Sequence, residues 1–228
     1  MFANKKLVRG LVTQARRAER ATLEALRYGR VEQEPAFTDR LLGALEHMLN
    51  GRTIGGIRWT AKTFTDRGRH SQESRTGADF MEAFQVDLHD FHVAKGFLAQ
   101  AKLVEPTDGF PSSEAVRLKE QCEKMLAHSP AAYVFLYSQQ SGVMVVPAVE
   151  IVAARDCNPH ELTAQPMAKF FESHFECFIG DHHIQGADRT SVDQLRERFD
   201  ARTIFVLKGV GLQPPRDATH ESTVPPRT

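Results

Sequence analysis

The strongest constraint on the fold is a pair of strand-like segments in which an apolar pattern is interrupted at two positions. Residues 81–88 form the first segment and residues 96–104 form the second. Gln100 and Lys102 interrupt the second segment, and the period of two in a strand places both side chains on one face. A lysine in an apolar strand is costly to bury unless a counter-charge or an anion meets it. Asp79, at the start of the first segment, is the expected partner.

Asp79, Gln100 and Lys102 together supply a carboxylate, an amide oxygen and an ammonium group. Groups of this kind can hold a hard divalent cation and a phosphate. A purely structural interpretation is also open, in which Lys102 and Asp79 form an ion pair and Gln100 bonds to a backbone group. The order of the three residues, the strand-like segments around them and an acid on the helix upstream favour a functional site.

The helix expected over residues 35–49 places that upstream acid. Its apolar residues recur with helical spacing and are Phe37, Leu41, Leu42, Leu45, Met48 and Leu49. At about 100° per residue, Glu34 projects toward this buried face at its N-terminal end, whereas Asp39 and Glu46 fall outside it. Glu34 therefore either reaches the end of the sheet, beside Asp79, or only complements the positive end of the helix.

These residues resemble the core of the PD-(D/E)xK nuclease superfamily. The resemblance is to the restriction-endonuclease-like branch that has Gln in place of the second acid, which includes the Mrr-like enzymes. The matching residues are the turn 77–79, the segment Gln100 to Lys102, and Glu34 on the preceding helix. Ala78 stands where the proline of the family's name would precede Asp79. The resemblance covers about residues 30–105.

The resemblance implies metal-dependent hydrolysis of phosphodiester bonds in DNA, with a role in restriction or antiviral defence. In such a family Asp79, Gln100 and Glu34 would ligate Mg²⁺ or Mn²⁺. Lys102 would orient or activate the attacking water, or hold the scissile phosphate. The alternative is a catalytically inactive nuclease-like fold that binds nucleic acid or protein, because a neutral Gln ligand binds metal less tightly than an acid. DNA or RNA preference, an activating protein partner and a homo-oligomer all stay open.

Charge is balanced overall but uneven along the chain. The 228 residues carry 29 basic and 29 acidic side chains, which weakens any nucleic-acid affinity that rests on net charge alone. The first 30 residues are nevertheless basic, with Lys5, Lys6, Arg9, Arg16, Arg17, Arg20, Arg27 and Arg30. This segment is predicted to be a helix with a narrow apolar stripe, either peripheral or docked on a partner chain. Its basic side chains form either a solvated face or an arm that contacts phosphates.

The remaining pattern predicts an α/β fold with a central mixed β-sheet flanked by helices. Strands are expected over residues 57–64, 131–137, 143–151 and 203–210, and helices over 113–128, 166–178 and 191–198. The predicted organisation is a basic N-terminal helix over residues 1–30, a nuclease-like domain over 31–212, and a Pro-rich disordered tail over 213–228. A polar loop before Asp79 carries Arg67, Arg69 and Arg75, which either contact phosphates or are merely solvated.

The cysteine count bears on compartment and on metal binding. Three cysteines do not suggest a disulfide framework, and the chain lacks an apolar run that could span a bilayer or act as a secretory signal, so we expect a cytoplasmic protein without membrane contact. A second set of candidate ligands is Cys157, His160, His174 and Cys177. These residues could bind zinc, or Cys177 could simply pack among phenylalanines.

Overall fold

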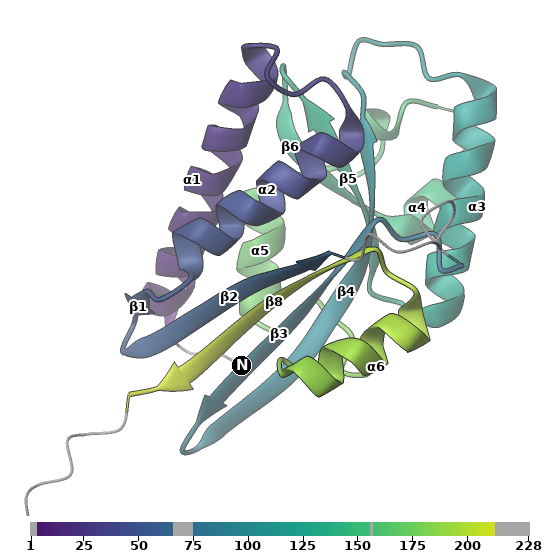
Figure 1. The fold of residues 1–228 in the computed structure, drawn as a ribbon. Coiled ribbons are helices and arrows are strands. Elements are labelled where there is room, and N and C mark those ends of the chain that lie inside the picture. Colours follow the sequence, from purple (N-terminus) through teal and green to yellow (C-terminus); the bar gives the residue numbers. More distant parts are fainter. Residues whose placement is uncertain (1–3, 66–74, 156, 213–228) are drawn as a thin grey trace, which may run out of the picture.

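The computed structural model describes residues 4–65, 75–155 and 157–212, which form an eight-stranded sheet with helices on both faces (Figure 1). The strands are β1 Thr53–Ile54, β2 Ile57–Thr65, β3 Phe80–Leu88, β4 Phe91–Leu103, β5 Ala132–Ser138, β6 Gly142–Pro147, β7 Gln165–Pro166 and β8 Thr203–Gly211. The helices are α1 Lys5–Arg27, α2 Glu34–Leu49, α3 Ser112–His128, α4 Ala148–Ala153, α5 Met167–Phe175 and α6 Arg189–Phe199, with a 3₁₀ turn at Pro159–Glu161. The predicted α/β class, a central mixed sheet flanked by helices, is confirmed.

The order of the strands brings distant segments together. Across the sheet the order is β1-β2-β8-β3-β4-β5-β6-β7. The β8–β3 and β4–β5 pairs are parallel, and the other pairs are antiparallel. The last strand in sequence, β8, therefore lies between β2 and β3, and the start of β8 lies beside the start of β3.

Both faces of the sheet are buried. Helices α1, α2 and α5 cover one face, and α3, α4 and α6 cover the other (Figure 1). In β3, Phe80 and Phe84 pack into the first layer, whereas Met81 and Ala83 pack into the second. This alternation is the expected period of two in a strand, and it assigns every side chain near the start of β3 to a definite layer.

Helix α1 belongs to the core of this same chain. The side chain of Asn4 caps it by accepting a hydrogen bond from the backbone N–H of Leu7 at 3.1 Å. The apolar stripe of the helix, from Leu7 to Leu26, is buried and packs with α2 and α5. The stripe is thus covered without a partner chain, and the basic side chains of α1 lie on its outer side.

Three predicted elements differ from the structure in their bounds. The strand predicted over residues 143–151 ends at Pro147, which has no N–H to donate to a ladder, and the following residues form α4. The helix predicted over 166–178 ends at Phe175, and Cys177 turns the chain with a φ of 67°. The strand predicted over 96–104 begins earlier, at Phe91, because it pairs with β3 in a tight hairpin.

Two further expectations concern the chain as a whole. Within the described ranges, no helix combines the length and the apolar character needed to cross a membrane. The tail predicted over residues 213–228 lies outside the described residues.

Candidate active site at the open edge of strand β4

Two carboxylates meet the part of β4 that extends past the start of β3. The last ladder contact there is the N–H of Asp79, which donates to the carbonyl of Ala99 at 2.9 Å. The next two N–H groups on this edge belong to Ala101 and Leu103. The Oδ2 atom of Asp79 accepts from Ala101 at 2.9 Å, and the Oε2 atom of Glu34 accepts from Leu103 at 3.0 Å. Each acid thus satisfies a backbone donor that no strand pairs.

Each acid reaches this edge from a different element. Asp79 comes directly before β3, on the face of the sheet that α3 covers. Glu34 is the first residue of α2, which covers the opposite face, and its side chain reaches the end of the sheet. Short side chains at the starts of two elements are therefore sufficient to bring the acids together.

Gln100 and Lys102 lie on the same edge of β4, as their spacing predicts. The Nε2 atom of Gln100 donates to Oδ2 of Asp79 at 2.6 Å, so these side chains share one face of the sheet. Lys102 forms its ion pair with Glu34, and Nζ lies 3.8 Å from Oε1. The side chain of Lys102 is only 11% exposed, so it depends on this negative neighbourhood. Glu34, and not Asp79 alone, is therefore the counter-charge that its burial requires.

Burial and neighbouring groups shift the pKa of Asp79 in opposite directions. Burial raises its pKa above the ordinary value, and the hydrogen bond from Ala101 opposes this shift. The positive charges of Lys102, Arg202 and Arg117 also lower the pKa of Asp79, but burial dominates. Ionised Asp79 is therefore less favourable in the folded protein than in water.

Glu34 is in the same situation. Burial raises the pKa of Glu34, the charge of Lys102 lowers it, and the charge of Asp79 raises it again. The two carboxylates therefore repel each other when both are ionised. A cation between them would relieve both the repulsion and the cost of burial.

The raised pKa of Asp79 predicts what happens when its charge is removed. Asp79→Asn should stabilise the metal-free protein at neutral pH, because the substitution removes a charge that is unfavourable to bury. A carboxyl whose folded pKa exceeds its unfolded value, about 3.9 for Asp, contributes stability below the unfolded pKa and loses it as pH rises through the folded pKa. The advantage of the variant should therefore appear near neutral pH and vanish in acid. Thermal unfolding in chelator across pH measures it, at about 2–4 °C per kcal/mol for a chain of this size.

Asp188→Asn is the matched control for this measurement. Asp188 caps α6 with its side chain and is exposed, and Asn is an equally good N-cap. Its free energy of unfolding should stay within about 0.5 kcal/mol of the wild-type value. If Asp79→Asn proves less stable than the wild type at neutral pH, the hydrogen bonds that Asp79 accepts outweigh the cost of its burial.

The oxygen atoms at this edge are of the kind that a divalent cation binds. Carboxylate and amide oxygens are the ligands that Mg²⁺ and Mn²⁺ prefer. Gln100 is 2% exposed, and its Oε1 atom has no hydrogen-bond partner among the described residues, which is unusual for a buried amide. The amide oxygen and nitrogen exchange places by a simple flip, which would turn Oε1 toward Asp79. The residues therefore fit a cation, although no cluster of three His, Cys, Asp or Glu side chains suited to a metal occurs in the described ranges.

Other acids of α2 lie away from this edge. Glu46, at the far end of the helix, accepts a hydrogen bond from the N–H of Thr63 at 2.7 Å. Asp39 is exposed on the outer side of the helix. Of the acids that α2 carries, Glu34 is the one that contacts Lys102.

The arginines predicted on the preceding loop are placed in part. Arg75 is exposed, and its Nε atom lies 3.5 Å from the carboxylate of Asp200 at the end of α6. Arg67 and Arg69 lie outside the described residues. Arg75 is thus already paired with an acid of its own chain.

The second set of candidate ligands does not come together. His174, a residue of α5, is fully buried, and its Nε2 atom lies 3.1 Å from Oε2 of Glu82. His160 instead contacts the carbonyl of Val104 at 3.0 Å, and Cys157 lines a hollow next to α3. The two Cys–His pairs therefore pack on different layers of the sheet, and Cys177 packs against the apolar core.

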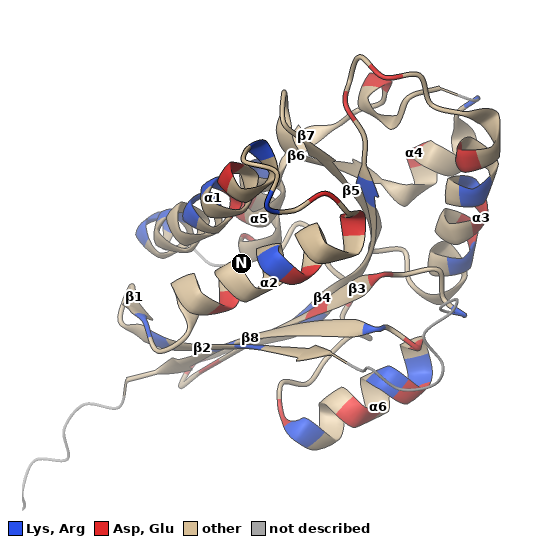
Figure 2. Cartoon of the chain, turned by 45° about the horizontal axis from the view of Figure 1, so that its top comes forward, with Lys and Arg blue, Asp and Glu red and all other residues tan. Residues whose placement is uncertain are grey.

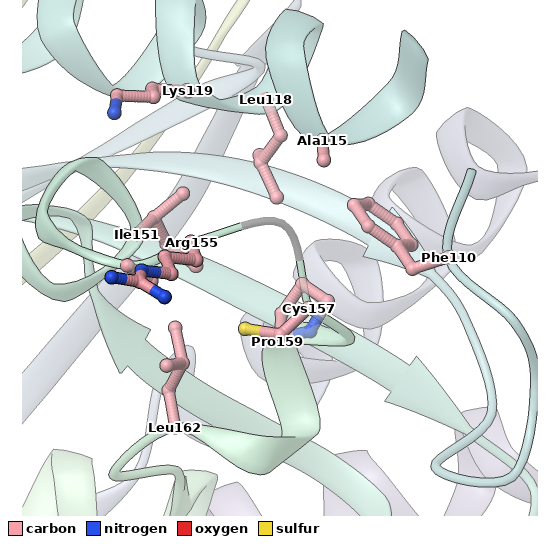
Figure 3. A pocket seen from close by; sticks show the side chains of 10 residues that line it. Phe110, Ala115, Leu118, Lys119, Ile151, Arg155, Cys157, Pro159 and Leu162 are labelled. Carbon is pink, nitrogen blue, oxygen red and sulfur yellow. The ribbon is translucent and has the colours of Figure 1, made fainter. Parts of the chain in front are cut away.

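That hollow is separate from the acidic edge. Most of its lining residues are apolar, and they come from α3, α4, the turn that follows α4, and Phe110 before α3 (Figure 3). Lys119 and Arg155 are the basic residues that line it. Lys119 therefore marks the side of α3 that faces away from Asp79, which makes it useful as a control.

Sequence reasoning missed three neighbours of the site. Arg117 on α3 and Arg202 before β8 act on the charge of Asp79, and the buried hydroxyl of Tyr137 contacts Thr38 at 3.0 Å close to both acids. No local pattern marks these residues, because they reach the site through the docking of α3 and the insertion of β8.

A scan against protein-family models and searches of curated proteins and of solved structures find no match to this chain.

Proposed function

We propose that the chain is a metal-dependent nuclease that hydrolyses phosphodiester bonds of DNA, with a nuclease-like core of the PD-(D/E)xK type. The observation that carries the proposal is the edge of β4, where Asp79 and Glu34 accept consecutive free N–H groups beside Gln100 and Lys102. The acids are buried enough to raise their pKa values, which is typical of functional sites. The resemblance of the motif residues extends the proposal to restriction or antiviral defence in the cytoplasm.

Each side chain would have a separate role in the proposed reaction, set by its chemistry. Asp79, Glu34 and the amide oxygen of Gln100 would hold Mg²⁺ or Mn²⁺, which supplies an activated water and charge stabilisation when bound. Lys102 would place its ammonium group against the phosphate oxygens, whose negative charge grows in the transition state. Partial burial of these groups limits their contact with bulk water and strengthens each electrostatic interaction.

One observation favours the alternative, a catalytically inactive nuclease-like fold that binds nucleic acid or protein. Asp79 and Glu34 already have a structural role, since they satisfy backbone donors at the end of β4. Gln100 is neutral and donates to Asp79 in the present arrangement. The contacts at this end of β4 would therefore have a structural purpose even in a protein that is not catalytic.

The test of the proposal is cleavage by the purified chain. Supercoiled plasmid and linear duplex DNA are incubated with Mg²⁺, Mn²⁺, Ca²⁺ or chelator. We expect cleavage with Mg²⁺ or Mn²⁺ and none in chelator. Glu34→Gln should lower the rate on the order of 100-fold, because it weakens both the cation site and the environment of Lys102.

Asp39→Asn is the matched control, since Asp39 lies on the same helix and faces solvent. Its rate should equal that of the wild type. Cleavage that persists in chelator, or that is normal in Glu34→Gln, would contradict the proposed site. DNA binding without cleavage under every metal condition would favour the binding module instead.

A further inference from the structure

Arg202 lies beside Asp79 because of the strand register. In the parallel pair of β3 and β8, Phe80 is the partner of Thr203. The residues just before them, Asp79 and Arg202, are therefore neighbours at the starts of adjacent strands, which lie about 4.8 Å apart. Arg202 is exposed, and its charge lowers the pKa of Asp79. One flank of Asp79 thus presents a cation to solvent.

Arg117 approaches from the other flank. Helix α3 lies so close to the turn before Asp79 that a Cβ atom at Gly77 would be 2.5 Å from the carbonyl oxygen of Gln121. Arg117 precedes Gln121 by four residues, so both lie on the same face of α3. Arg117 is also exposed, and its charge also lowers the pKa of Asp79. Two different elements therefore bring arginines to the same carboxylate.

Neither arginine has an acidic partner within ion-pair distance in the described part of the chain, whereas Arg75 and Arg196 pair with Asp200 and Asp193. Both side chains are exposed, and both act on the charge of Asp79. Guanidinium groups bind phosphate in a planar, bidentate manner. An anion at the mouth of the site would therefore meet two available donors.

The outer face of α1 is the competing basic surface. Its arginines are exposed, and Figure 2 shows Lys and Arg along this helix. Helix α1, however, covers the face of the sheet opposite to α3 and α6. A DNA strand bound along α1 would have to pass around the end of the β-sheet to reach Asp79.

We infer that Arg117 and Arg202 bind the phosphates that flank the scissile bond of a DNA strand, which crosses the site on the α3 and α6 side of the sheet. This inference rests on the proposed nuclease function and adds the residues that position its substrate. The phosphate backbone is the feature recognised, because both donors are charged and face solvent.

A measurement of DNA binding tests this inference independently of cleavage. The affinity of a fluorescein-labelled duplex is measured by anisotropy in Ca²⁺ and in chelator, over a series of salt concentrations. Arg117→Ala and Arg202→Ala should each weaken binding about tenfold. The double variant should lower the slope of log affinity against log salt by about 2, because each lost phosphate contact removes about 0.9. Arg117→Lys should retain part of that slope, which a merely structural role of Arg117 would not predict.

Two controls use basic residues elsewhere. Lys119→Ala, two residues along α3 and facing the hollow of Figure 3, should bind as the wild type does. A triple Ala variant of Arg16, Arg17 and Arg20 removes charge from α1 and should reduce affinity less than the double variant does. In cleavage assays the loss of Arg117 or Arg202 should raise KM more than it lowers kcat.

The inference is overturned if the α1 variant weakens binding while the Arg117 and Arg202 variants bind and cleave like the wild type. In that case the proposed nuclease function still stands. If the wild-type chain neither binds nor cleaves DNA, the proposed function fails together with the inference. The two failures are thus told apart by the behaviour of the wild type.

Discussion

Lys102→Met should lose DNA cleavage by about a hundredfold or more while the chain stays folded. The side chain of Lys102 is mostly buried, its ammonium group lies 3.8 Å from Glu34, and its charge acts on Asp79. In the proposed reaction its charge would stabilise the negative charge that develops on the phosphate, so its removal should affect the transition state more than the folded ground state. Met keeps the length and the apolar stem of the side chain, which limits any loss of packing. Rates measured at saturating Mg²⁺ on one duplex substrate test this.

Folding and metal binding are followed in the same samples. The variant should give a wild-type circular dichroism spectrum and should still gain thermal stability on addition of Mg²⁺, because its carboxylates are intact. Lys62→Met, on an exposed position of β2, is the matched control and should cleave normally. Normal cleavage by Lys102→Met would show that Lys102 is a structural partner of Glu34, and the nuclease proposal would lose its main support.

Gly77→Ala should cost about 2–4 kcal/mol of stability, the sum of two effects. Gly77 has a φ of +72°, which is unfavourable for a residue with a Cβ atom. In addition, the new methyl group would lie 2.5 Å from a backbone oxygen of α3 and 2.9 Å from the Cα atom of Gln121. A backbone segment cannot yield as a flexible side chain can, so α3 must move away. Urea unfolding of the variant and the wild type measures the difference.

Gly29→Ala separates the two effects. Gly29 has a φ of +62°, and no atom lies within 4 Å of the position of an added Cβ atom. This control carries the backbone strain alone, which we expect to be about 1 kcal/mol. Equal losses at both glycines would mean that α3 does not press against the turn before Asp79. A larger loss at Gly77, with weakened DNA binding, would tie the approach of α3 to the placement of Arg117.

Much of the candidate site was predictable from spacing along the chain. Two residues separate Gln100 from Lys102, so a strand must place them on one face whatever surrounds it. Glu34 stands at the tip of an amphipathic helix, so the buried stripe of that helix directs it inward. The helical period alone distinguishes Glu34 from Asp39 and Glu46. The α/β class follows in the same way, from the alternation of helical and strand-like apolar patterns.

Other features depend on partners that no local pattern identifies. The counter-charge of Lys102 was expected to be Asp79, but the ion pair is with Glu34, which lies 68 positions earlier in the chain. The strand predicted to continue past Pro147 stops there, because the proline lacks the donor that a ladder needs. The capping of Ala101 and Leu103 by the two acids arises because β4 extends beyond β3, and strand lengths are decided by pairing across the sheet.

By itself, the sequence determined which residues share a face of each helix or strand, because covalent spacing and the periods of 3.6 and 2 act locally. It thereby placed Gln100 and Lys102 on one face of a strand and Glu34 on the inner face of its helix, but not their contacts with one another or with Asp79. The surroundings of these four residues depend on how the whole chain packs. The insertion of β8 between β2 and β3 brings Arg202 to Asp79, and the close contact of α3 at Gly77 brings Arg117. Those contacts follow from how the whole chain buries both faces of one sheet, which is a property of long-range packing and not of any short segment.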